Sequence, residues 1–236
     1  MLIANELGSC PQYAADGPRS ARLGRKGAGT AIDRIPAWAV VLLLSQPAYS
    51  QGTDARHKQA LADFCLEYME VRYPGVDLNG DILYVSVQRQ RMFHVRERTM
   101  LREYMISTST QGPGTERNSY RTPTGLHHVS ERIGEGVPMW GILKERLFTG
   151  ELADSTCTDD RDVITSRILW LRGLESGVNT GGNVDSHDRW IYIHGTVNEG
   201  SIGTPSSRGC IRMRNTDIIT LFNEIPTGTL VLILDN

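Results

Sequence analysis

Residues 190–215 read WIYIHGTVNEGSIGTPSSRGCIRMRN. The run opens with alternating apolar residues at positions 190–193, which predicts a strand that ends at His194. Sixteen positions later, Cys210 follows a turn of small residues and precedes the apolar residue Ile211. We therefore expect an imidazole at the end of one strand and a thiol on the turn that leads into the next.

This combination of residues favours nucleophilic catalysis by the thiol. A free cysteine has a pKa of about 8.5, so a neighbouring base or positive charge must favour the thiolate. His194 can accept the thiol proton, and Arg208 adds positive charge beside Cys210. The backbone N–H groups of Gly209 and Cys210 are candidate donors to an oxyanion formed during attack on a carbonyl carbon.

Each of these residues taken singly also has a structural interpretation. A cysteine beside a glycine is more often a small buried residue than a catalyst. A histidine at a strand end is more often a hydrogen-bonded structural residue, so only its combination with Cys210 favours catalysis. Arg212 is expected to donate to loop carbonyls, and Asn215 is expected to cap the helix that follows.

The segment 192–215 resembles the signature of the L,D-transpeptidase catalytic domain. That family carries a His-Gly pair on a strand, then an Ile-Gly pair, then a Ser-His-Gly-Cys turn followed by an aliphatic residue and arginine. The matching positions here are His194-Gly195, 202–203, 207–210 and 211–212. The resemblance implies that Cys210 is the acylated nucleophile, that His194 is its base, and that the carbonyl of Gly195 orients the imidazole.

One position departs from the family pattern. Arg208 stands where the family usually has a second histidine, which lines the site. Arginine does not exchange protons near neutral pH, but it can stabilise a thiolate or a peptide carboxylate. The candidate substrate contacts are Ser207, Arg208, Tyr192 and Arg212. The candidates for the wall of a groove for an extended peptide are Trp140, Trp170, Tyr192, Asp185 and His187.

The resemblance also implies a reaction and a substrate. Cys210 would form a thioester with a tetrapeptide stem of peptidoglycan and transfer it to an acceptor amine, with no cofactor. Two alternatives stay open. Water could replace the amine, which gives a carboxypeptidase or hydrolase, or the Arg208 departure could mark a domain that binds wall peptides without turnover.

Composition bounds the class of protein. The 236 residues are 39% hydrophobic and 22% charged, which suits one catalytic domain with an appendage. A formal net charge of −2 gives no electrostatic support for binding nucleic acid. The sequence does not indicate which oligomeric state the protein adopts.

The cysteine spacing does not indicate a metal site. Cys10, Cys65, Cys157 and Cys210 form no C-x-x-C pair, so we expect no metal ligands. If Cys10 is removed with a leader, a bridge between Cys65 and Cys157 is possible, and Cys210 would stay free.

Residues 1–50 read as an export leader. Several arginines precede an apolar run at 35–44, and Ala48-Tyr49-Ser50 supplies the small residues that a signal peptidase reads. The run is about half the roughly 20 residues of a membrane-spanning helix, so only transient membrane contact is expected; an uncleaved anchor is the alternative. Export to the bacterial periplasm or cell envelope agrees with a wall substrate.

The rest of the chain predicts a helix followed by a mainly β domain. Residues 51–80 form a helical segment, with Leu61, Phe64, Cys65 and Tyr68 recurring at steps of three and four. Residues 81–235 then form the catalytic domain, which the resemblance covers over 81–234.

Short strands dominate this domain. Strands are expected at 82–87, 91–95, 99–108, 126–129, 164–171 and 229–234, with a helix at 216–222. Because most strands are separated by turns rather than helices, the expected fold is a mainly antiparallel, L,D-transpeptidase-like β-sandwich with a few short helices. A Thr-Pro-x-Gly turn at 122–125 also matches the family, and His127 and His128 after it are expected to be non-catalytic.

Overall fold

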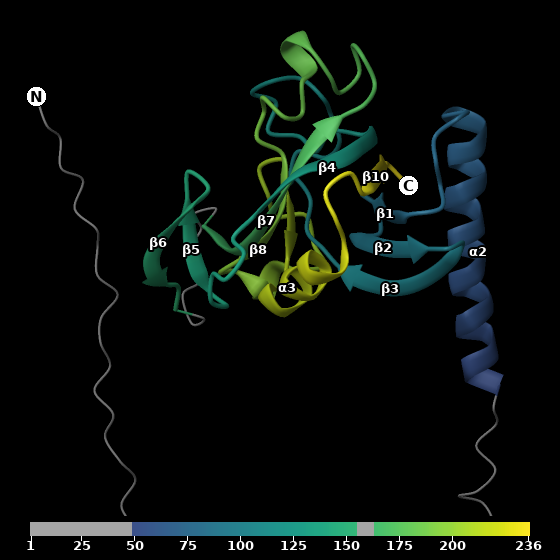
Figure 1. The fold of residues 1–236 in the computed structure, drawn as a ribbon, viewed down its shortest axis with the longest axis horizontal. Coiled ribbons are helices and arrows are strands. Elements are labelled where there is room, and N and C mark those ends of the chain that lie inside the picture. Colours follow the sequence, from purple (N-terminus) through teal and green to yellow (C-terminus); the bar gives the residue numbers. More distant parts are fainter. Residues whose placement is uncertain (1–48, 155–162) are drawn as a thin grey trace, which may run out of the picture. The chain divides into compact units, whose positions relative to one another are not determined.

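The computed structural model describes residues 49–154 and 163–236, and these form one compact unit (Figure 1). The predicted leader, apart from its last two residues, lies outside the described residues, as do Cys10 and Cys157. Within the described ranges, no helix is long and apolar enough to cross a membrane.

The protein is mainly β, as predicted. A helix, α2 (Tyr49–Arg72), comes first, and α3 (Asn215–Glu224) and two short 3-10 helices (Gly182–Val184 and Glu199–Ser201) lie in the second half. The strands are β1 (Asp81–Ser86), β2 (Arg91–Arg96), β3 (Thr99–Met105), β4 (Gly125–Ile133), β5 (Gly141–Lys144), β6 (Leu147–Leu152), β7 (Ile164–Gly173), β8 (Tyr192–Thr196), β9 (Ile211–Met213) and β10 (Leu230–Leu234).

The strands form one mixed sheet. Its order is β3-β2-β1-β10-β4-β7-β5-β6, and β8 extends it from β7 to β9. Most neighbours are antiparallel, as expected from the short turns, but β1 pairs with β10 and β8 pairs with β9 in parallel. The closing strand therefore returns to the middle of the sheet beside the first strand.

The sheet encloses its main core between its two halves. Side chains from β1, β2, β10 and β4 meet those from β7, β8, β9 and α3 in one buried apolar cluster. A second cluster lies on the other face of β1, β2 and β10, beneath α2, which runs beside these strands in Figure 1. A third cluster lies on the outer face of β7 and β8, on the opposite side of these strands from the main core.

The buried face of α2 differs from the predicted stripe. Ala62, Cys65, Leu66 and Met69 are fully buried, whereas Phe64 is 42% exposed. Cys65 of the predicted stripe is fully buried, and Leu61 and Tyr68 pack partly buried against the same cluster. The buried face is therefore turned slightly from the predicted stripe, which leaves Phe64 exposed. Cys65 is a free thiol in this cluster, so the expected bridge from it is not formed.

Candidate active site

The pairing of β8 with β9 brings the predicted base and nucleophile to the same face of the sheet. Ile193 lies opposite Ile211 and His194 lies opposite Arg212, so Cys210, just before β9, is a diagonal neighbour of His194. Ile193 and Ile211 point into the main core. Since side chains alternate along a strand, His194 and Cys210 both belong to the other face.

His194 is held in one orientation by its own strand. It is fully buried, and its Nδ1 lies 2.8 Å from the carbonyl oxygen of Gly195, the contact that the resemblance implied. A carbonyl oxygen can only accept, so Nδ1 carries the proton and Nε2 of the neutral ring carries the lone pair. Structure and prediction differ in one respect: His194 lies in the middle of β8, not at its end.

Cys210 is half-buried at the end of the turn. Its Sγ lies 3.4 Å from the carbonyl oxygen of Trp190, and its side chain packs against the third apolar cluster, which contains Trp170 and Tyr192. The thiol thus has one side against aromatic rings and another toward solvent. This is the partly exposed position that a nucleophile requires.

The turn before Cys210 is fixed by internal hydrogen bonds. Ser207 is fully buried; its hydroxyl donates to the carbonyl of Cys210 at 2.6 Å and accepts from the N–H of Gly209 at 3.2 Å. The Ser207 side chain is therefore used inside the turn, and a substrate contact by it is not supported. Gly209 has φ +123°, a left-handed value that favours glycine, and its N–H would have to leave Ser207 to serve an oxyanion.

The predicted Thr-Pro-x-Gly turn at residues 122–125 stabilises the turn before Cys210 through hydrogen bonds. The hydroxyl of buried Thr122 donates to the carbonyl of Gly209 at 3.0 Å and accepts from the N–H of Ser109 at 3.0 Å. Residues far apart in the chain therefore meet at the base of the cysteine turn.

Asn215 does not cap α3 as predicted; Arg214 occupies the cap position and Asn215 is the first helical residue. The fully buried Asn215 side chain instead links β7, β8 and the loop after β8. Its oxygen accepts from the hydroxyls of Thr165 (2.7 Å) and Ser166 (2.6 Å), and its nitrogen donates to the carbonyl of Thr196 (2.9 Å) and to Glu199 (2.8 Å). Asn215 thereby anchors the strand that carries His194.

Arg189 is a site residue that the sequence analysis missed. Its guanidinium donates to the carbonyls of Thr115 at 2.8 Å and Arg121 at 2.6 Å. Burial lowers the pKa of the Arg189 guanidinium, and the side chain of Cys210 opposes this, so the two groups are within electrostatic range. The acceptors lie about 70 residues earlier in the chain, so no local pattern could have indicated the role.

Trp190 was predicted to begin the strand, but it ends a turn. Its φ is +58°, which is rare for a bulky residue, and its N–H donates to the carbonyl of His187 at 3.0 Å. This conformation aims the Trp190 carbonyl at Cys210 and leaves the side chain 62% exposed. Such strain in a residue that contacts a candidate nucleophile is common at functional sites.

Aromatic rings form the apolar wall of the site. The ring of His187 stacks on Trp170 with centres 4.0 Å apart, and the guanidinium carbon of Arg146 lies 4.7 Å from the Trp170 centre. Two groups this close cannot share one face, so they cover opposite faces of the indole. Arg146 also donates to the hydroxyl of Tyr192 at 3.3 Å, and burial raises the pKa of that phenol.

The two candidate arginine contacts differ in exposure. Arg208 is exposed beside the thiol, whereas Arg212 is only 5% exposed, which favours a structural role for Arg212. His127 lies apart from the nucleophile, as expected: its Nε2 contacts the Ser186 hydroxyl at 3.0 Å, and complete burial lowers its pKa to about 4.

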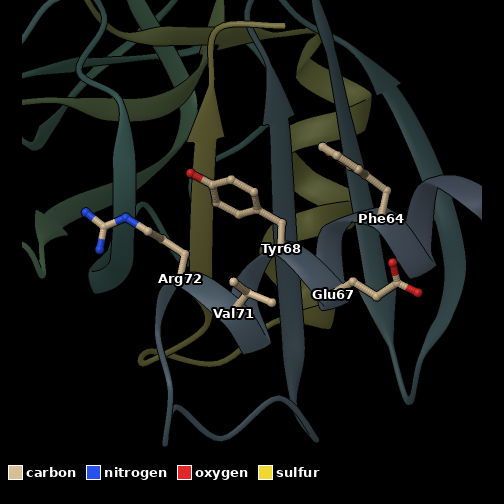
Figure 2. Close-up of a pocket in the computed structure, with 5 residues that line it drawn as sticks. All are labelled: Phe64, Glu67, Tyr68, Val71 and Arg72. Atoms are coloured by element: carbon tan, nitrogen blue, oxygen red, sulfur yellow. The ribbon is translucent and has the colours of Figure 1, made fainter.

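Other candidate sites among the described residues carry no comparable chemistry. No group of three or more histidine, cysteine, aspartate or glutamate side chains in those ranges could hold a metal ion. A hollow of about 590 Å³ lies on the outer side of α2, lined by Phe64, Glu67, Tyr68, Val71 and Arg72 (Figure 2). It contains no nucleophile or base comparable to the Cys210 and His194 pair.

Comparison with known families agrees with this geometry. The model of the YkuD L,D-transpeptidase catalytic domain matches residues 80–233, more than half of the chain. The chain belongs to this L,D-transpeptidase family. The matched range covers nearly all of residues 81–234, over which the sequence resembles this family.

Individual relatives of the L,D-transpeptidase family match over shorter segments. The Bacillus subtilis protein named "Putative L,D-transpeptidase YqjB" is 49% identical over 57 residues, which is 24% of this chain and 32% of the relative. The B. subtilis protein named "Putative L,D-transpeptidase YkuD" is 56% identical over 41 residues, 17% of this chain and 25% of the relative. These matches span a third or less of the relatives' own length.

Solved structures of L,D-transpeptidases are also similar to the chain. One from Xylanimonas cellulosilytica aligns with 19% identity and a TM-score of 0.39, covering 72% of this chain and 68% of the other. L,D-transpeptidase 3 from Mycobacterium tuberculosis, solved with a faropenem-derived adduct, aligns with 14% identity and a TM-score of 0.41, covering 66% and 60%.

Proposed function

We propose that the protein is a cysteine transpeptidase that acts on peptidoglycan stem peptides through a thioester on Cys210. The observation that carries this proposal is the β8–β9 register, which puts Cys210 and His194 on one face with the His194 ring oriented by Gly195. Family membership supports the proposed reaction class, and the half-buried position of the Cys210 thiol supports its proposed role as nucleophile.

In the first half-reaction, Cys210 Sγ attacks the carbonyl carbon of the peptide bond after the third residue of a tetrapeptide stem. The S–C bond forms and the C–N bond to the terminal D-alanine breaks. The thiol proton passes to Nε2 of His194 and then to the departing amine. Backbone N–H groups of the cysteine turn are the candidate donors to the transient oxyanion.

In the second half-reaction, the amine of a neighbouring stem attacks the thioester. A new C–N bond forms, the S–C bond breaks, and the amine proton returns through His194 to the sulfur. Both half-reactions use only the thiol, the imidazole and backbone donors, so the scheme has no step that requires a cofactor.

Two alternatives share the first half-reaction or its binding step. Water in place of the amine would make the protein a carboxypeptidase or a hydrolase of wall crosslinks. A domain that binds stems without turnover is the alternative suggested by Arg208 in place of the family's histidine. The half-exposed Cys210 beside a buried, oriented His194 favours turnover over binding alone.

We further propose that the protein acts outside the cytoplasmic membrane, in the periplasm or cell envelope. A stem-peptide substrate is found there, and the composition of residues 1–50 is that of an export leader.

Intact mass spectrometry tests the enzyme proposal. The protein is incubated with a carbapenem or a tetrapeptide stem, with and without an acceptor amine. We expect a covalent mass increment on the wild-type protein and none on Cys210→Ala; Cys65→Ala, the matched control, should acquire the same increment. Binding without any increment would contradict an enzyme, and the released products distinguish transfer from hydrolysis.

A further inference from the structure

Arg208 has an unusual position next to the proposed nucleophile. It is exposed, two residues before Cys210, on a turn whose backbone is fixed by Ser207 and Thr122. Among the residues that the structure describes, none makes a hydrogen bond or an ion pair with the Arg208 side chain. The fixed turn thus exposes a guanidinium group that makes no hydrogen bond or ion pair with the described residues.

Two hollows meet at this side chain. One has a volume of about 390 Å³ and the other about 340 Å³, and both are lined by Arg208 and Tyr120. Tyr120 is 59% exposed, and Trp190, on the first hollow, is 62% exposed. Exposed aromatic rings flanking a free guanidinium are typical of a surface that binds peptide.

The first hollow has an excess of positive charge. Its charged lining residues are three arginines, Arg117, Arg189 and Arg208, and one carboxylate, Asp188. Asp188 lies 3.7 Å from Arg117, and the Arg189 guanidinium is committed to backbone carbonyls. Arg208 is therefore the arginine of this hollow that is available to a ligand.

We propose that Arg208 forms a carboxylate-binding subsite, so that the enzyme selects stem peptides with a free carboxylate next to the bond that Cys210 attacks. This rests on the function proposed above and adds the ligand chemistry of one subsite. The guanidinium group pairs with a carboxylate through two parallel N–H donors, and a neutral carboxamide cannot replace that charge. The carboxylate has two possible sources, the terminal residue and the side chain of a diaminopimelate at position three.

Peptide binding to the Cys210→Ala protein tests the subsite without requiring turnover. Calorimetry compares a tetrapeptide with both carboxylates free against peptides amidated at the C-terminus, at the third side chain, or at both. We expect the doubly amidated peptide to bind about tenfold or more weakly, because it cannot form the charge-assisted hydrogen bonds with the guanidinium group. The singly amidated peptides show which carboxylate is bound.

Adding Arg208→Gln to Cys210→Ala should remove this preference by weakening only the binding of the charged peptides. Arg208→Lys should keep part of the preference, and Arg56→Gln, the same charge change at an exposed position on α2, should keep all of it. An unchanged preference in the Arg208→Gln protein, equal binding of charged and amidated peptides, or no binding of any peptide would overturn the subsite. Failure of the enzyme proposal would appear separately, as the absence of a Cys210 adduct.

Discussion

Two thiols in the described part of the chain, Cys65 and Cys210, occupy opposite kinds of surroundings. Cys65 lies fully buried beneath α2 among apolar side chains, and burial raises its pKa to about 12. Cys210 is half-buried on a turn, where its Sγ contacts the carbonyl of Trp190 and the guanidinium of Arg189 lies within electrostatic range. The same side chain is thus a packing element at one site and a candidate nucleophile at the other.

The difference shows that the surroundings, and not the residue type, give a cysteine its chemistry. An apolar environment penalises the charged thiolate, whereas a base and fixed positive charge favour it. The pairing of β8 with β9 places His194, the proposed base, on the same face as Cys210, and Arg189 is the proposed source of nearby positive charge. The experiments below change one contribution at a time and use Cys65 as the internal reference.

The largest effect is expected from removing the imidazole. His194→Ala should slow acylation of Cys210 by about 10² to 10⁴-fold, because a positioned general base contributes that much. Intact mass spectrometry of reactions quenched at successive times measures the rate of adduct formation. His57→Ala, at an exposed position on α2, should leave the rate unchanged. Equal rates for wild type and His194→Ala would show that another group activates the thiol.

The second effect concerns the anchor of the His194 strand. Asn215→Ala leaves the hydroxyls of Thr165 and Ser166 without their buried acceptor and removes one of the two donors from residue 215 to Glu199, which should cost about 3 kcal/mol in the free energy of unfolding. Urea denaturation measures this cost, and Asn223→Ala, at an exposed position on α3, is the matched control.

Hydrogen exchange of the Asn215→Ala protein should affect the region around Cys210 more than the region around Cys65. Amides of β8 and β9 should exchange faster, while those of α2 and β1 around Cys65 should change little. Uniform loosening of both regions would mean that Asn215 stabilises the whole domain and not the strand of His194 in particular.

The third effect concerns Cys65 and pH. An ordinary thiol has a pKa of about 8.5 to 9, and in the folded protein burial raises the pKa of Cys65 to about 12. The folded state therefore keeps the proton, and its stabilising contribution is complete below pH 9 and is lost as pH rises from 9 towards 12. At pH 11 the loss should be about 2 to 3 kcal/mol.

Denaturation of Cys65→Ala at pH 7 and pH 11 measures this contribution. The variant should lose about 1 to 2 kcal/mol at pH 7 from the smaller side chain. It should then show a shallower decline toward pH 11 than the wild type, with an unchanged acylation rate. Parallel pH profiles for the two proteins would mean that Cys65 does not titrate as a buried thiol.

The smallest effect is expected from Arg189. Arg189→Gln removes one positive charge near Cys210 and weakens the contacts to the carbonyls of Thr115 and Arg121. The rate of Cys210 alkylation at pH 7 should fall about three- to tenfold, and less at high salt, since a partly exposed charge is screened. A rate equal to that of the wild type would leave Arg189 with a purely structural role.

The sequence was sufficient to predict the mainly β class and the L,D-transpeptidase family. It also indicated Cys210 and His194 as the candidate nucleophile and base, and these roles stay predictions. Alternation of apolar residues located most strands to within a few positions, since one face of each strand is buried. The spacing of His194 and Cys210 was informative because the family motif fixes several residue types at once.

Features that depend on long-range contacts could not be predicted. Asn215 was expected to cap a helix because that preference is local, but its side-chain partners come from β7, β8 and the loop after β8. Trp190 fits an alternating strand, but a contact with His187 holds its backbone in a turn. The parallel pairing of β1 with β10 joins segments from opposite ends of the domain, beyond the reach of any pattern in a short window.

The most direct test of the account is the rate at which each thiol is alkylated in the folded protein at pH 7. Iodoacetamide labelling followed by peptide mapping distinguishes Cys65 from Cys210 and from the other cysteines in one experiment. We predict that Cys210 reacts at least about 100-fold faster than Cys65, because thiolate character and access both favour it. Equal rates, or a Cys210 that reacts only after unfolding, would contradict the claim that this turn presents an activated nucleophile.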